Sequence, residues 1–182
     1  LPRVLGIDEH TLHKGQRFVT TFCNLKNRKI FDVLEGKSQK DLSHFLSLMK
    51  DRHKVQVVCI DLSSSYRELI KRWFPNAKIV ADRFHVIRII QHHFLNFCRS
   101  MLPEIKNRRG LLRALRKNTD NLTPKDQLAL DQLFKSHPII EELYQRQMYL
   151  RSLLKLKTLS KDSCREHIAQ LMDMLLELDQ CG

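Results

Sequence analysis

Two aspartates come directly after two apolar runs that have the composition of buried strands. Asp8 follows residues 4–7 and Asp61 follows residues 57–60. A carboxylate beside a buried strand loses hydration, so it needs a cation or hydrogen-bond donors in compensation. Mg²⁺ and Mn²⁺ prefer carboxylate and water oxygens as ligands. If the two strands are parallel neighbours, we expect Asp8 and Asp61 to share divalent ions at one edge of a sheet.

Such a metal site would serve phosphodiester chemistry. Two ions roughly 3.5–4 Å apart can activate a water or a 3′-hydroxyl and stabilise the leaving oxygen. A simpler role is also open for each carboxylate. Asp61 could cap the helical pattern that follows it, and Asp8 could be a loop carboxylate, since capping is a common use of aspartate.

A third strand-like run, residues 77–81, leads into Asp82, and His85 follows three residues later. The simplest interpretation makes Asp82 a helix N-cap with His85 in the first turn. The alternative is that Asp82 or His85 supports the metal cleft or contacts the substrate. Glu9 adjoins Asp8, but side chains alternate along a strand, so we do not expect Glu9 to be a ligand.

The elements that must position these residues follow from hydrophobic pattern and turn signals. Five segments have strand length and chemistry: residues 4–7, 17–23, 29–34, 55–60 and 77–81. The polar link at residues 24–28 suits a hairpin, so the first three strands should form an antiparallel meander. Capping-box patterns at Ser38 and Ser65 start helices between the later strands. Right-handed crossovers then predict a mixed α/β sheet of order 3-2-1-4-5 with flanking helices.

From Arg83 onward the strand chemistry stops and apolar residues recur at helical spacing. One long helix is predicted to run to about Pro103, and further helices should restart at Pro124 and Pro138. The sequence therefore predicts an α/β core over residues 1–100 and an all-helical region over residues 101–182.

The charge balance favours a polyanionic partner. The 182 residues include 32 Lys or Arg and 20 Asp or Glu, for a net charge of +12, while 42% hydrophobic content is enough for a packed core. Between residues 83 and 117 there are nine basic residues and one acid: Arg83, Arg88, Arg99, Lys106, Arg108, Arg109, Arg113, Arg116, Lys117 and Glu104. We expect this stretch to contact double-stranded DNA through its phosphates, the alternative being a solvated helix face.

Five scattered cysteines without a C-x-x-C pair argue against a disulfide framework or a zinc ribbon and favour a reducing compartment. No apolar run approaches the roughly 20 residues of a membrane span, and the start lacks the pattern of a signal peptide. We expect a cytoplasmic, nucleoid-associated protein. Because the chain starts at Leu1, we also expect it to be part of something longer.

Three motifs in register carry a resemblance to a known family. Residues 6–9 (Gly-Ile-Asp-Glu), 60–66 (Ile-Asp-Leu-Ser-Ser-Ser-Tyr) and 80–86 (Val-Ala-Asp-Arg-Phe-His-Val) resemble the catalytic domain of bacterial insertion-sequence transposases of the ISL-three type. These are DDE transposases with an RNase H-like core. The resemblance is close over residues 3 to about 100, and the remainder resembles the helical insertion of the family.

The resemblance implies that Asp8 and Asp61 are the first two acidic residues of the DDE triad, with Mg²⁺ or Mn²⁺ as the cofactor. It places Asp82 and His85 in the D-x-x-H element of related groups such as the Mutator-like transposases. It also implies that transposon ends and target DNA are partners, and that a homodimer handles paired ends.

One family feature is not matched. The third carboxylate of the triad, a Glu on an Asn- and Lys-rich helix, has no counterpart here. Glu166 and Glu177 lie in amphipathic patterns without those neighbours, so we expect solvated helix-face residues. The third carboxylate is then expected beyond residue 182, and this fragment is expected to be inactive alone.

Two other functions fit the same residues. An RNase H-like nuclease or resolvase uses the same strand-end carboxylates. A non-catalytic nucleic-acid-binding domain would use the aspartates only as helix caps.

Overall fold

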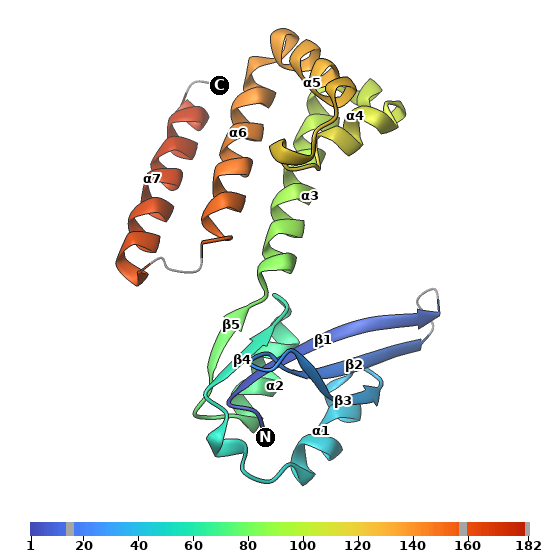
Figure 1. The fold of residues 1–182 in the computed structure, drawn as a ribbon, viewed down its shortest axis with the longest axis vertical. Helices are drawn as coiled ribbons and strands as arrows, with labels where there is room; N and C mark the ends of the chain where they lie inside the picture. Colours follow the sequence, from blue (N-terminus) through green and yellow to red (C-terminus); the bar gives the residue numbers. More distant parts are fainter. Residues whose placement is uncertain (14–16, 157–159, 181–182) are drawn as a thin grey trace. The chain divides into compact units, whose positions relative to one another are not determined.

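The computed structural model describes residues 1–13, 17–156 and 160–180 (Figure 1). It divides into two compact units, Leu1–Val86 and Ile87–Gly182, each with its own hydrophobic core. The division falls inside helix α3 (Arg83–Met101), whereas the sequence pattern placed the boundary at residue 100. The strand-like sequence stops at Arg83, which is close to the observed division.

The first unit is built on one five-stranded sheet of order β3-β2-β1-β4-β5, which confirms the predicted order. Its strands are β1 (Val4–His13), β2 (Arg17–Asn24), β3 (Lys29–Glu35), β4 (Val57–Ile60) and β5 (Lys78–Ala81). The first three pair antiparallel, and β4 and β5 run parallel to β1. β1 is longer than predicted because it pairs with β2 well beyond residue 7.

Two helices fill the crossovers, α1 (Gln39–Leu48) and α2 (Ser64–Trp73). The predicted capping box at the start of α1 is present between Ser38 and Asp41. Gly36 turns the chain into this box with φ of +97°, and a Cβ atom there would lie 2.5 Å from a carboxylate oxygen of Asp41. Only glycine meets both conditions at low cost.

The predicted capping box at the start of α2 is wrong. The N-cap is Ser63, without a side-chain cap, and Ser65 already lies in the first turn. The physical reason is local, because the Asp61 carboxylate accepts the Ser63 N–H at 2.9 Å and the Ser65 hydroxyl lies 2.7 Å from that of Ser63. These bonds move the helix start two residues earlier.

Both α1 and α2 pack against the same face of the sheet. That face and the two helices form the core of the unit, which includes Leu5, Ile7, Phe22, Val58, Ile60, Leu42, Leu46, Tyr66, Leu69 and Ile70. The alternate residues of the strands face the other way and are smaller or more polar: Gly6, Asp8, Cys23, Cys59 and Val80. None of these belongs to the core cluster, so this second face is where polar chemistry is available.

The second unit is helical throughout its described residues, as predicted. Beyond α3 it contains the short turns η2 (Pro103–Asn107) and η3 (Thr119–Asn121) and the helices α4 (Arg109–Ala114), α5 (Pro124–Ser136), α6 (Pro138–Leu153) and α7 (Lys161–Gln180). Both predicted restarts are confirmed, since Pro124 and Pro138 open α5 and α6.

Aromatic packing holds these helices together. The ring centroids of Tyr144 and Phe134 lie 5.3 Å apart, and Phe94 of α3 packs on the same tyrosine. Helix α7 lies beside α6 (Figure 1), where the Tyr149 hydroxyl and His167 Nδ1 are 2.9 Å apart. Across the described part of the chain, no helix has both the length and the apolar content to cross a membrane.

Candidate active site

The register of the parallel strands brings three aspartates to one level of the sheet. Gly6 of β1 pairs with Cys59 of β4, which in turn pairs with Val80 of β5. Asp8, Asp61 and Asp82 each come two residues after these partners. The Asp82 N–H donates to the Ile60 carbonyl at 2.7 Å, which continues the ladder past the end of β5. Equivalent positions of parallel strands share a face, so the three aspartates lie on the face of the sheet opposite to α1 and α2.

Asp8 lies on β1 with its side chain 41% exposed. Its Oδ1 accepts the N–H of Glu9 at 2.9 Å and lies 3.4 Å from His85 Nε2, while His10 Nε2 is 3.7 Å from Oδ2. The His85 side chain is only 13% exposed and also lies 3.9 Å from Asp82 Oδ2. The structure therefore brings Asp8, Asp82 and His85 together.

Asp61 stands at the turn between β4 and α2. Its Oδ1 accepts the Ser63 N–H at 2.9 Å. Beside it is a hollow of about 330 Å³ that Arg67 and Lys71 of α2 also line. These two cations were not predicted from the sequence, although their four-residue spacing just after Asp61 puts them on one helix face.

Asp82 has the simpler of its two expected roles. Its Oδ1 accepts the N–H of Phe84 at 2.8 Å and its carbonyl accepts the N–H of Val86, so it caps α3. The cap uses one carboxylate oxygen. The other oxygen faces His85, so capping and a supporting role beside Asp8 are compatible.

Two cysteines lie close enough to the aspartates for the carboxylate charge to affect their pKa values. Burial raises the pKa of Cys59, and the carboxylates of Asp82 and Asp8 raise it further. Burial and then Asp8 likewise raise the pKa of Cys23 on the neighbouring strand. Both thiols lie on the face that carries the aspartates, so the charge of these carboxylates acts on that face of the sheet.

Glu9 belongs to the opposite face, as expected. It pairs with Thr20 across the β1–β2 ladder, and the Thr20 hydroxyl lies 3.3 Å from that of Tyr66 on α2. Burial raises the pKa of Tyr66, and the Glu9 carboxylate adds to that shift. Glu9 therefore acts on the helix side of the sheet.

The described residues contain no group of three or more His, Cys, Asp or Glu side chains arranged to hold a metal ion. Asp8 and Asp61 can each offer carboxylate oxygens, which leaves most of the coordination shell of a hard divalent ion to water and other groups. Glu166 is exposed on α7, and the side chain of Glu177 lies outside the described part of the chain.

Three of the predicted DNA-binding residues meet at one place in the second unit. Arg108, Arg109 and Arg113 line a hollow of about 430 Å³ at α4 and the start of α5. Lys125 lines the same hollow and was missed, because it lies beyond the basic stretch that the sequence pattern singled out.

The remaining basic residues differ in their surroundings. Arg83, Arg88, Lys106 and Arg116 are exposed, and Arg99 donates to the Asn96 side chain at 2.9 Å. Lys117 is different, because its side chain is 25% exposed and forms an ion pair with the buried Asp126.

That ion pair has a structural role. The Lys117 ammonium and the Thr123 hydroxyl hold the pKa of Asp126 well below its usual range. Asp126 also closes the capping box at the start of α5 with Thr123. A count of acids within residues 83–117 overlooked this partner because it comes from the next helix.

Comparison with known proteins agrees with this architecture. A family model described as a transposase, of the ISL-three DDE type, matches residues 5–180. A curated relative, the transposase for insertion sequence element IS1001 from Bordetella parapertussis, is 28% identical over 153 residues. The match covers 77% of this chain and 37% of that relative, so the chain spans well under half of the relative's length. With the family model matching nearly the whole chain, the protein belongs to the ISL-three family of DDE transposases.

Proposed function

We propose that this chain is the catalytic core of a DNA transposase, in which Asp8 and Asp61 hold Mg²⁺ or Mn²⁺ for phosphodiester hydrolysis and strand transfer at transposon ends. The observation that carries the proposal is the strand register, which sets Asp8, Asp61 and Asp82 at one level of one sheet face. A third carboxylate, from outside the described side chains, would complete the site.

The donor chemistry fits the proposed ions. Asp8 and Asp61 offer carboxylate oxygens, the ligands that hard divalent cations prefer, and each aspartate fixes one oxygen through a backbone N–H. Bound ions would supply the charge that activates an attacking hydroxyl and stabilises the leaving oxygen.

The residues of the chain orient these carboxylates in advance. The Glu9 N–H and the His85 imidazole both approach Asp8 Oδ1, and the Ser63 N–H holds Asp61 Oδ1. His85 is itself positioned by the first turn of α3, which Asp82 caps. Neighbours that fix a ligand in this way commonly change metal affinity by 10–100-fold. We therefore assign His85 and Asp82 to positioning Asp8.

Two basic hollows support DNA as the substrate. Arg67 and Lys71 line the hollow beside Asp61, and Arg108, Arg109 and Arg113 line the hollow on α4. Guanidinium and ammonium groups bind phosphate oxygens largely without sequence preference. Double-stranded transposon ends and target DNA are the partners in this proposal, and a homodimer on paired ends is part of it.

The metal site is tested by titration. Calorimetry with Mn²⁺ should show at least about tenfold weaker binding for Asp8→Asn and for Asp61→Asn than for the unaltered protein. Asparagine keeps the size of the side chain and its ability to accept the backbone N–H, so the fold is preserved. Asp120→Asn, which neutralises an exposed carboxylate of the second unit, is the matched control and should bind as the unaltered protein does. Equal affinity in all four proteins would refute the assignment.

The DNA surface is tested by salt dependence. Replacing Arg108, Arg109 and Arg113 by glutamate should make the slope of log affinity against log salt shallower by about 3, since each phosphate contact contributes roughly 0.9. The same reversal at Lys26, Arg28 and Lys29, three exposed cations of the β2–β3 hairpin, is the control. An unchanged slope in the α4 variant would remove this hollow from the DNA interface.

One observation favours a non-catalytic nucleic-acid-binding domain as a second candidate. Asp61 and Asp82 each accept a backbone N–H next to a helix start, which is what purely structural aspartates do. Such a domain would bind DNA without any metal dependence. The Mn²⁺ titration separates the two functions, because structural aspartates would leave divalent-ion binding unchanged on substitution.

A further inference from the structure

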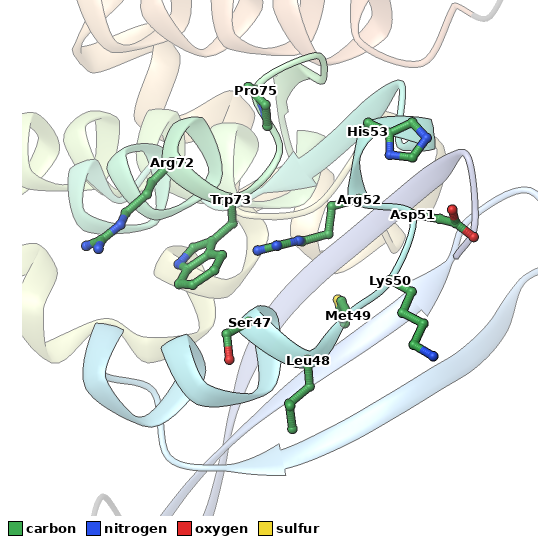
Figure 2. A pocket seen from close by; sticks show the side chains of 10 residues that line it. All are labelled: Ser47, Leu48, Met49, Lys50, Asp51, Arg52, His53, Arg72, Trp73 and Pro75. Carbon is green, nitrogen blue, oxygen red and sulfur yellow. The ribbon is translucent and has the colours of Figure 1, made fainter.

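A third, larger hollow lies in the first unit at the amino ends of β4 and β5, the ends opposite to Asp61 and Asp82. Its volume is about 930 Å³, and it is lined by residues 47–53 together with Arg72, Trp73 and Pro75. These segments are the end of α1 with the connection before β4, and the end of α2 with the connection before β5 (Figure 2). β4 has four residues, a span of about 13 Å, which separates this hollow from Asp61.

Most of the charged side chains in the lining are cations. Lys50, Arg52 and Arg72 contribute three positive charges, and Asp51 contributes the single carboxylate among the lining residues. Asp51 is already paired with Lys54 at 3.2 Å, so it offsets little of that charge. The hollow therefore presents a positive potential to solvent.

Trp73 organises two of these cations. The Arg52 guanidinium lies 4.9 Å from the centroid of the indole ring and that of Arg72 lies 5.6 Å from it. Figure 2 shows Arg52 extending toward the ring. A stacked guanidinium uses its flat face for the ring and keeps its in-plane N–H groups for an anion. In the part of the chain that the structure describes, neither Arg52 nor Arg72 forms an ion pair with a carboxylate.

The indole itself is fixed and has a donor to spare. Trp73 packs against the core of the first unit, which holds the ring in place. Its Nε1 is buried and has no hydrogen-bond partner in the part of the chain that the structure describes.

We infer that this hollow binds the phosphodiester backbone of DNA, with Arg52 and Arg72 donating to phosphate oxygens while Trp73 holds their guanidinium groups. The identity of the anion as DNA rests on the proposed function. Because the arginines lie over the indole, the ring supports the cations and is not a platform for stacked bases. The strand bound here is remote from the carboxylates, so the site positions DNA and does not contact the reacting phosphate.

The shape of the hollow favours a long polyanion. Most of the lining side chains are exposed, including Ser47, Leu48, Lys50 and Arg72. A shallow hollow of this kind can bind a DNA backbone that enters at one side and leaves at the other. A site for a small anion would instead enclose the anion. An acidic peptide is the competing occupant, and the experiment below includes it.

The test uses Trp73 as its own reporter, since it is the only tryptophan of the 182 residues. The protein is titrated in EDTA with a DNA duplex, and with poly-glutamate of matched charge, while tryptophan fluorescence is recorded at several salt concentrations. We expect a saturable change with DNA and a weaker or absent one with poly-glutamate. In Arg52→Gln/Arg72→Gln the slope of log DNA affinity against log salt should be shallower by about 2. Between roughly 50 and 200 mM salt, the unaltered protein should therefore lose about tenfold more affinity than the double variant does.

The control removes the same charge elsewhere. Lys26→Gln/Arg28→Gln, on the exposed β2–β3 turn, should leave the fluorescence change intact. If the double arginine variant keeps the full slope, or if DNA binds without altering the fluorescence, the inference is overturned. Equal responses to DNA and poly-glutamate would also overturn it, in favour of a peptide site.

EDTA keeps this test separate from the metal site. Loss of Mn²⁺ binding in Asp8→Asn without change in the tryptophan response would leave the inference standing. If the tryptophan response is absent while Mn²⁺ binding is intact, the inference is refuted and the proposed metal site is not.

Discussion

The two ends of the parallel strands in the first unit carry opposite charge. Asp61 and Asp82 come directly after β4 and β5, and Asp8 lies on β1 at the same level, whereas Arg52 and Arg72 come before the amino ends of β4 and β5. One end offers oxygen ligands to a cation and the other offers N–H donors to an anion. A single small sheet can thus present two complementary sites without sharing a residue between them.

The two ends are also built differently. The carboxylates project directly from strands or from the first residue after a strand, so backbone hydrogen bonds fix their position. The cations are long side chains from helix ends and from the turn η1 (Arg52–Lys54), and stacking on Trp73 restrains them. Variants of one end should therefore leave the other unchanged, and the predictions below test that independence.

The largest expected effect is stabilisation by metal at the carboxyl end. At a Mn²⁺ concentration of 100 times the dissociation constant, binding should stabilise the protein by about 2.7 kcal/mol and raise its melting temperature by roughly 5–10 °C. Asp8→Asn/Asp61→Asn should abolish the rise, and Arg52→Gln/Arg72→Gln should keep it. Differential scanning calorimetry with and without Mn²⁺ measures both. Loss of the rise in the arginine variant would show that the ends are coupled.

The next effect separates capping from positioning at the same end. Asp82→Ala removes the acceptor for the Phe84 N–H, so it should lower the free energy of unfolding by about 0.5–2 kcal/mol in urea. Asp82→Asn keeps an N-cap acceptor and should cost much less. If both variants lose metal affinity but only alanine loses stability, Asp82 has both roles. Equal stability of the alanine variant and the unaltered protein would contradict the cap.

A smaller effect belongs to the amino end. Trp73→Phe removes the larger ring under the two guanidinium groups and should cost about 0.5–1 kcal/mol in stability. A double-mutant cycle with Arg52→Met isolates the contribution of that pair. A coupling energy of zero would mean that the indole does not hold Arg52. Mn²⁺ affinity serves as the control and should not change.

The smallest effect is electrostatic and uses the cysteines. Asp8 raises the pKa of Cys23 and Cys59, after the larger contribution of burial. Removing that charge in Asp8→Asn lowers both pKa values, so the thiolate fraction at pH 8.5 rises and alkylation by iodoacetamide becomes faster. Mass spectrometry measures each cysteine separately. Cys98, whose pKa burial raises to about 11, lies in the second unit and should react equally slowly in both proteins.

The sequence predicted the sheet because its signals are local. Strand chemistry, the polar hairpin link and the handedness of crossovers suffice for the order β3-β2-β1-β4-β5. Asp61 and Asp82 come directly after parallel strands, as the sequence predicted, whereas Asp8 lies within β1, which continues to His13. The start of α2 was missed because the bonds of Asp61 and Ser63 move it, and no propensity scale contains them.

Contacts between helices could not be predicted from the sequence. The pairing of Lys117 with Asp126 depends on how α5 packs after α4, and Lys125 joins the arginine hollow for the same reason. Trp73 packs against the core of the first unit. The two arginines on its ring come from separate segments, so only the tertiary structure joins them.

The most direct test of the central assignment is to map the metal with iron. Fe²⁺ replaces Mg²⁺ or Mn²⁺ at carboxylate sites, and with ascorbate and peroxide it cleaves the backbone close to where it is bound. We predict cuts near residues 8, 61 and 82, lost in Asp8→Asn/Asp61→Asn and suppressed by excess Mn²⁺. Cleavage elsewhere in the chain, or cuts at these positions that survive the double substitution, would contradict a metal site at the carboxyl ends of the strands.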